Sequence, residues 1–125
     1  MNRTGRPVSP SVTIYSLPIA AVASISTRVT GVLLSLGAFG IGGIELMGGS
    51  GTALSMMGSI GGTGFLIAAP AKFAVAFPIV FHSLSGYRHF VWDQLPQFLN
   101  NDDVPKSSIL LFGSSSLISL GLIFV

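Results

Sequence analysis

His82 and His89 are the two histidines of this chain, and they lie seven residues apart at the end of a long apolar segment. Seven residues are close to two helical turns, so both rings would lie on one helix face, roughly 10 Å apart along the axis. A neutral imidazole is a good ligand for haem iron, and an imidazolium or an arginine is a good partner for haem propionates. One ring could therefore bind the iron of a haem while the other contacts the propionates of the same haem.

The residues around the histidines leave two interpretations open. Gly86, one turn after His82, has no side chain and Ser85 has a small one, which would leave room for a flat macrocycle against the helix. A histidine that only packs between helices, bonded to a neighbouring carbonyl, would give the same pattern. Arg88 and His89 are either contacts for propionates or snorkelling side chains that reach lipid phosphates.

A second polar pair, Ser24 and Arg28, stands four residues apart and so shares one helix face. A hydroxyl can donate to a carbonyl, and a guanidinium can stabilise charge that develops on reduction. Alternatively, Ser24 is only a serine at the membrane interface, and Arg28 is one of the positive charges that set the orientation of the chain in the membrane. Lys72 and Glu45 fall within apolar segments, and we expect Lys72 to snorkel to the interface or to pair with Glu45.

The composition indicates a membrane protein. Half of the residues are apolar and 8% are charged, against roughly 25% charged in an average soluble domain. The chain has no cysteine, which excludes disulfides, thiolate metal ligands and iron–sulfur ligation by this chain. A dispersed net charge of +2 gives no support for nucleic-acid binding, which needs clustered basic residues.

The apolar blocks predict an all-α membrane protein with three transmembrane helices. The family resemblance described below implies that these helices are part of a multi-subunit helical bundle. The spans are expected at about residues 29–47, 65–92 and 107–125. Residues 1–15, with two prolines, read as an extended N-terminal segment, and residues 16–125 as the three-helix transmembrane anchor domain.

The helix ends and connections can also be predicted. The first helix should begin near Ser16, with this serine as its cap and Pro18 in the first turn. Residues 48–64 are rich in Gly, Ser and Met and predict a loop, with a short helical piece possible at residues 53–59. Residues 95–106 predict a polar loop.

The basic residues suggest an orientation in the membrane. Five of the six precede the first span or flank the second loop, and the first loop has none. By the positive-inside rule, the side that carries them is the cytoplasm of a bacterium or the matrix of a mitochondrion.

Three runs of residues resemble a known family. Residues 82–93 match the pattern His-x-x-x-Gly-x-Arg-His-x-x-x-Asp without a gap, residues 24–31 read Ser-x-x-x-Arg-x-x-Gly, and residues 6–10 read Arg-Pro-Val-Ser-Pro. These runs resemble the large cytochrome b subunit of succinate dehydrogenase, the membrane anchor of respiratory complex II. Since residues 71–78 are also similar to the second helix of that family, the likeness covers nearly the whole chain.

For the haem, the resemblance implies that His82 is one axial ligand of the iron of haem b, shared with a second, small membrane subunit that supplies the other ligand. His89 and Arg88 become candidates for the propionates. Many family members have a histidine directly before the arginine of the first helix, near the propionates. This chain has Thr27 there, which can hydrogen-bond but carries no positive charge.

For the substrate and partners, Ser24 and Arg28 match the serine and arginine that line the family's ubiquinone pocket beside the iron–sulfur subunit. FAD and the iron–sulfur clusters would lie in partner subunits, the flavoprotein and the iron–sulfur protein, where succinate would be oxidised. The lead-in at residues 6–10 resembles mitochondrial and alphaproteobacterial members. We expect the mitochondrial inner membrane with the N-terminus in the matrix, or alternatively a bacterial plasma membrane with the N-terminus in the cytoplasm.

Two other classes of function are compatible with the sequence. One is a haem-free structural or assembly membrane protein whose histidines only pack. The other is a small channel or transporter subunit that uses Lys72 and Glu45 as its intramembrane charges.

Overall fold

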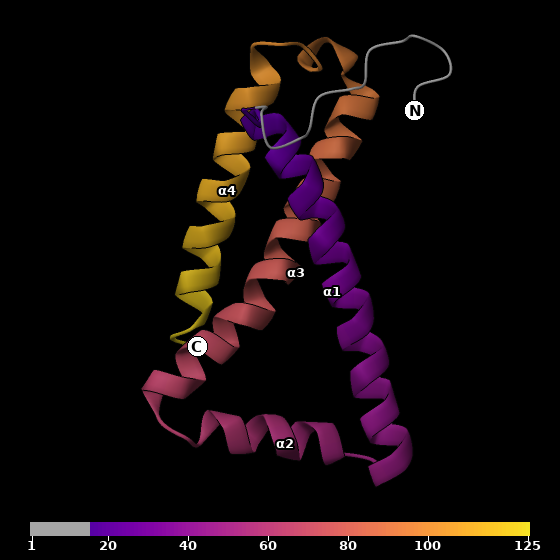
Figure 1. The fold of residues 1–125 in the computed structure, drawn as a ribbon, viewed down its shortest axis with the longest axis vertical. Helices are drawn as coiled ribbons and strands as arrows, with labels where there is room; N and C mark the ends of the chain where they lie inside the picture. Colours follow the sequence, from indigo (N-terminus) through magenta and orange to yellow (C-terminus); the bar gives the residue numbers. More distant parts are fainter. Residues whose placement is uncertain (1–15) are drawn as a thin grey trace, which may run out of the picture.

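The computed structural model describes residues 16–125, which form four α-helices and one short 3-10 turn and contain no strand (Figure 1). The predicted all-α class is confirmed. The predicted extended segment at residues 1–15, with its Arg-Pro-Val-Ser-Pro run, lies outside the described residues. The elements are, in order, α1 (Ile19–Gly48), α2 (Thr52–Gly61), α3 (Phe65–Gln94), η2 (Pro96–Phe98) and α4 (Asp103–Leu122).

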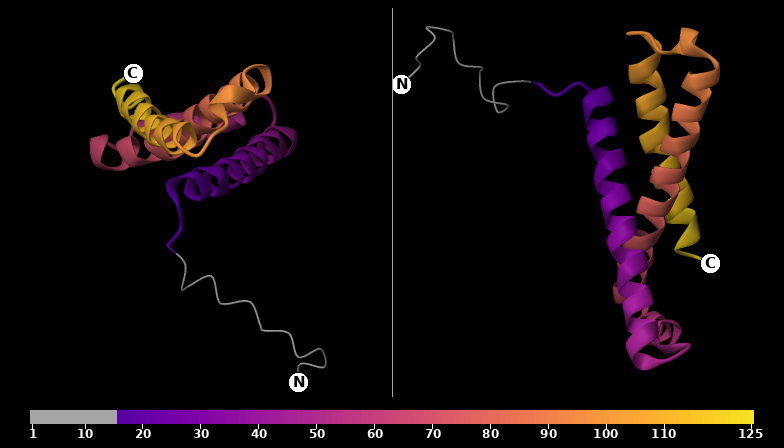
Figure 2. Two further views of the ribbon diagram at one scale, coloured as in Figure 1. Left: turned by 90° about the horizontal axis from the view of Figure 1, so that it is seen from above. Right: turned by 90° about the vertical axis from the view of Figure 1, so that its right-hand side faces the viewer.

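Three of the helices, α1, α3 and α4, pack against one another, and α2 runs across the far end between α1 and α3 (Figures 1 and 2). The start of α1, the end of α3 and the start of α4 lie together at the opposite end from α2. We call this the site end, formed by residues 19–31, 82–94 and 103–108. All the site residues predicted from the sequence are in the first two of these segments.

Most of the buried side chains are small and most large apolar side chains are exposed, with Phe81 as a fully buried exception. On α4 the buried face consists of Ser108, Ser115 and Ser119 with one leucine, whereas Leu110 and Leu117 are exposed. A helix in a soluble core would bury its leucines instead. Small residues at the contacts and large apolar residues outside are typical of helices that pack within lipid.

Two of the described helices, α1 and α3, are long and apolar enough to cross a membrane. Each has 30 residues and is about 45 Å long, whereas the hydrocarbon layer is about 30 Å thick. Only 6% of the most apolar stretch of α1 and 17% of that of α3 are buried, so these surfaces need lipid or partner subunits. Because α4 does not reach the same apolar content, the third predicted span stays a prediction.

Some predicted helix ends differ from the structure. The first helix begins at Ile19 rather than near Ser16, and Pro18 is its N-cap, in an extended conformation with φ −65° and ψ 150°. The reason is that a proline disfavours the helical conformation at the residue before it, so the helix cannot continue back through Leu17. The carbonyl of Pro18 instead accepts from the N–H groups of Ala21 and Val22, at 2.9 and 3.1 Å.

The two connections also contain more helix than the loops predicted from the sequence. The short helical piece expected at residues 53–59 is confirmed as α2. The last helix begins at Asp103, four residues before the predicted span. It starts early because the side-chain oxygen of Asn100 accepts from the N–H groups of Asp102 and Asp103, at 3.0 and 2.7 Å, and so satisfies donors that a helix start leaves open.

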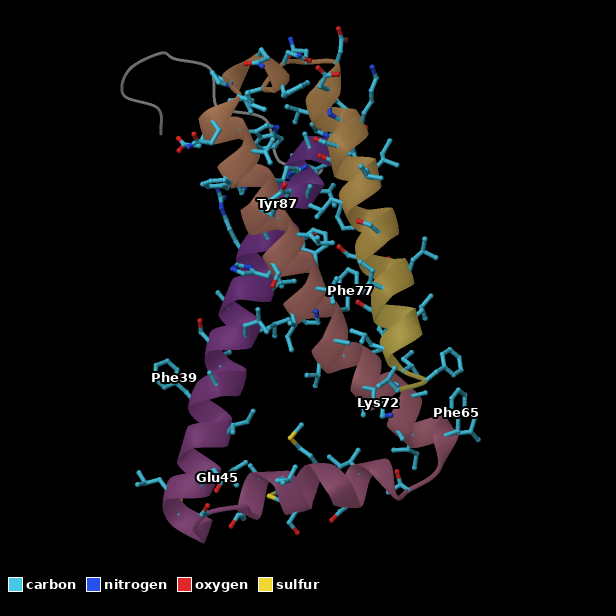
Figure 3. All side chains as sticks on the ribbon, turned by 180° about the vertical axis from the view of Figure 1, so that it is seen from behind. Phe39, Glu45, Phe65, Lys72, Phe77 and Tyr87 are labelled. Carbon is cyan, nitrogen blue, oxygen red and sulfur yellow. The ribbon has the colours of Figure 1, made fainter. Side chains whose placement is uncertain are left out.

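Of the two alternatives for Lys72, snorkelling or pairing with Glu45, the structure does not show the pairing. The carboxylate of Glu45 accepts from the N–H groups of Gly51 and Ala53, at 2.7 and 2.9 Å, and so caps the start of α2. Lys72 donates from Nζ to the carbonyl of Ile123, at 3.3 Å, just beyond the end of α4. Each charge is stabilised at the helix terminus of the opposite sign. Figure 3 shows Glu45 beside the start of α2 and Lys72 on α3, well apart from each other.

Candidate functional site

His82 lies on α3 where this helix crosses α1. Its Nδ1 lies 3.0 Å from the carbonyl oxygen of Thr27 and 3.4 Å from the hydroxyl of Thr30, both on α1. Because a carbonyl can only accept, Nδ1 carries a proton and donates it, and in the neutral ring Nε2 then has a free lone pair. This is the tautomer that a metal-binding histidine needs, and a backbone carbonyl is a common partner for the second nitrogen of such a ligand.

Gly31 provides the space for the His82 ring. A Cβ atom added at Gly31 would lie 2.9 Å from Cε1 of His82 and 3.4 Å from its Nδ1, closer than an ordinary contact between carbon atoms. In contrast, a Cβ added at Gly37, two turns further along the same helix, would meet nothing within 4 Å. Gly31 is therefore required where the imidazole packs against the backbone of α1.

Thr27 and Ser85 bind each other at the same crossing. Their hydroxyl oxygens lie 2.6 Å apart, and Thr27 also donates to the carbonyl of Ala23, at 2.9 Å. Since that bond uses the only hydroxyl proton of Thr27, Ser85 is the donor between the two, and Thr27 has no proton left for a propionate. Ser85 is fully buried, so its small size serves this contact rather than the space for a macrocycle that we expected. Gly86 does face open space.

The two other candidates for propionates, His89 and Arg88, lie on different faces of α3. His89 is exposed and packs edge-on against Trp92, with ring centroids 5.2 Å apart. It follows His82 by seven residues and so shares its face, as predicted. Arg88 turns toward α4, where its Nη1 donates to the hydroxyl of Ser108 at 2.9 Å. The structure therefore brings His89 to the His82 face and takes Arg88 away from it.

Ser24 and Arg28 lie on the first turns of α1, at the site end. Ser24 is half-buried and Arg28 is exposed, and neither side chain has a hydrogen bond or ion pair within residues 16–125. Within the described residues, both polar groups therefore lack a partner. Thr27, which holds His82 through its carbonyl, stands between them in the chain.

The sequence matches a known family over nearly its whole length. Residues 2–122 match the family model described as the succinate dehydrogenase/fumarate reductase transmembrane subunit. The chain belongs to this family. The resemblance found from the motifs is confirmed.

The similar proteins include members from mitochondria and from a bacterium. The chain is 35% identical to the mitochondrial succinate dehydrogenase cytochrome b560 subunit of Homo sapiens over 95% of its own length and 70% of the human protein. It is 34% identical to the corresponding protein of Dictyostelium discoideum, over 96% of this chain and 62% of that protein. For the succinate dehydrogenase cytochrome b556 subunit of Paracoccus denitrificans the identity is 33%, over 96% of this chain and 91% of the relative.

The site of this transmembrane subunit has the groups that would bind a haem iron from one side. His82 offers a free Nε2, and the open space beside Gly86 leaves one side of the helix accessible near this ring. No group of three or more His, Cys, Asp or Glu side chains that could hold a metal ion occurs within residues 16–125. Both histidines are on α3, and one helix face cannot supply two ligands on opposite sides of an iron. The chain can therefore provide one axial ligand, and the other would have to come from elsewhere.

The sequence motifs do not reveal how the transmembrane subunit fixes His82. The carbonyl of Thr27 carries no side-chain signal, and only the spacing of Gly31 from Thr27, one turn along α1, could have drawn attention to it. The threonine that replaces the family's usual histidine is likewise used inside the bundle, since it joins α1 to Ser85 on α3.

Proposed function

We propose that this chain is the membrane-anchor cytochrome b subunit of a succinate:ubiquinone oxidoreductase, and that it binds haem b and forms part of the ubiquinone site. The observation that carries the proposal is the hydrogen bond from Nδ1 of His82 to the carbonyl of Thr27, at 3.0 Å. It fixes the ring and directs the lone pair of Nε2 away from the bond, as an iron ligand requires. A histidine that only packs would gain nothing from an unpartnered second nitrogen.

The residues of this chain would hold the haem in a defined orientation. His82 binds the iron, and His89, two turns nearer the end of α3, meets the propionates. A second, small membrane subunit would supply the other ligand of the iron. A bound haem b supplies reversible one-electron transfer, while the chain sets the ring orientation through Thr27 and keeps water from the iron side with its apolar helices.

Ser24 and Arg28 would form this chain's share of the ubiquinone site. The hydroxyl of Ser24 donates to a quinone carbonyl, and Arg28 stabilises the negative charge that develops there during reduction. The position of both side chains on the first turns of α1, with Arg28 exposed and Ser24 half-buried, supports this assignment. The electrons come from the iron–sulfur subunit, which takes them from the flavoprotein subunit where succinate is oxidised.

The remaining parts of the proposal concern the membrane. α4 forms a third span beside α1 and α3, so that the two ends of residues 19–122 lie on opposite sides of the bilayer. In a mitochondrion, the chain then spans the inner membrane and the site end faces the matrix. In a bacterium, the chain spans the plasma membrane and the site end faces the cytoplasm. Relatives of both kinds support this pair of locations.

The proposal is tested by haem content in the assembled complex. We expect a pyridine haemochrome assay to give one protohaem per wild-type complex and a severe loss in the His82→Ala variant, because the other histidine of the chain, His89, lies two turns further along α3. Subunit stoichiometry in the same samples confirms assembly. An unchanged haem spectrum in the assembled variant would refute the axial role of His82, and a wild-type complex without haem would favour a structural or assembly protein instead.

A further inference from the structure

A groove of about 530 Å³ lies between α3 and α4 at the site end. Apolar residues form most of its walls, among them Leu84 and Val91 from α3 and Leu110 from α4. Two basic residues, Arg88 and Lys106, also line it. The groove is on another face of α3 from His82, and it plays no part in the function proposed above.

Arg88 is held in this groove without being neutralised. Its Nη1 donates to Ser108, its guanidinium carbon lies 4.4 Å from the ring centroid of Trp92, and its Nε is buried with no hydrogen-bond partner. A guanidinium has five N–H donors, and the hydrogen bonds of residues 16–125 use one of them. The ion pair found in the same part of the chain joins Lys106 to Asp103 at 4.0 Å. No described carboxylate therefore balances Arg88.

The groove also lies at the depth of the lipid headgroups. Arg88 follows the start of α3 by 23 residues, or about 35 Å, which is slightly more than the thickness of the hydrocarbon layer. Trp92 and Tyr87 line the groove at the same level, as aromatic residues do at membrane interfaces. Figure 3 shows Tyr87 on the part of α3 near the site end, far from α2.

We propose that the groove between α3 and α4 binds one anionic phospholipid. Its phosphate accepts hydrogen bonds from Arg88, its headgroup lies near Lys106, and an acyl chain runs along the apolar wall at Leu110. The two basic residues and Asp103 leave the groove with one positive charge, +2 − 1 = +1, which matches a lipid of charge −1. Arg88 bonds to α4 whereas His82 bonds to α1, so we do not assign a haem propionate as the partner of Arg88 in this groove.

The test measures lipid binding to the purified complex. Complexes are washed with detergent until weakly bound lipid is lost and are titrated with dioleoyl phosphatidylglycerol, and native mass spectrometry counts the lipids retained. We expect one tightly bound phosphatidylglycerol on the wild type, with affinity at least about tenfold weaker in Arg88→Gln and binding lost in Leu110→Trp, which fills the groove. Lys72→Gln, which removes a charge at the other end of the bundle, should behave as the wild type.

Two outcomes would overturn the proposal. One is equal retention of phosphatidylglycerol by wild type, Arg88→Gln and Leu110→Trp. The other is a benzophenone amino acid at position 114, in the groove wall, that crosslinks to another polypeptide rather than to lipid; this experiment remains decisive if Arg88→Gln fails to assemble. Haem content is measured in the same samples, so that the absence of haem would count against the proposed function and leave the lipid result standing.

Discussion

Replacing Gly31 by alanine tests the coupling between α1 and the haem ligand. The added Cβ would lie 2.9 Å from Cε1 of His82, whereas carbon atoms in contact are about 3.5 to 4.0 Å apart. The ring or the helix must therefore move by roughly 0.6 to 1.1 Å. A shift of this size can break the 3.0 Å bond to Thr27, because a separation of about 3.6 Å no longer counts as a hydrogen bond.

The expected consequences are loss of stability and of haem. Overpacking costs about 1 to 3 kcal/mol, and loss of the hydrogen bond that orients a metal ligand typically lowers metal affinity about 10- to 100-fold. Haem content is followed by the pyridine haemochrome assay while the purified complex is diluted. Gly37→Ala is the control, because a Cβ added at Gly37 meets nothing within 4 Å. If Gly31→Ala keeps its haem as well as the control does, the packing of His82 against Gly31 does not determine haem binding.

Three further predictions address the other functional residues. Ser24→Ala should lower succinate-to-quinone activity about three- to tenfold by removing one hydrogen bond, and Arg28→Leu should lower it more; wild-type activity in both would exclude them from the quinone site. His89→Ala should retain the haem with a lower midpoint potential in a redox titration, because a donor beside the propionates is lost, and an upward or zero shift would contradict this placement. Glu45→Gln should speed amide hydrogen exchange in α2 without changing haem content, since half of the carboxylate cap is lost; unchanged exchange would show that the cap is dispensable.

The sequence predicts the helices well because the signals for them are local. Apolar blocks bounded by Gly and polar residues place α3 correctly at its start and within two residues at its end. The seven-residue spacing puts His82 and His89 on one face whatever the rest of the fold does. The errors at the helix starts are also local, since they come from Pro18 and from the capping side chain of Asn100.

Contacts between helices could not be predicted in the same way, because they depend on where two helices cross. Opposite charge alone favours a pairing of Lys72 with Glu45, but the helix termini near them offer closer partners. Ser85 seemed to leave room for a ligand, and its position at the crossing makes it a partner of Thr27 instead. Nothing in the sequence tells that Arg88 will turn to α4 while the adjacent His89 stays exposed.

The crossing of α1 and α3 links the two proposed binding sites through a single helical turn. Ser24 and Arg28 are one turn apart on α1, and between them the backbone carbonyl of Thr27 orients His82 on α3. The hydroxyl of Thr27 is bonded to Ser85, so this turn is fixed to α3 by both its backbone and its side chain. A shift of α1 on binding a quinone would therefore move the acceptor of the His82 bond. Since the orientation and basicity of a metal ligand depend on that acceptor, occupancy of the quinone site should be detectable in the haem spectrum even though the two groups need not touch.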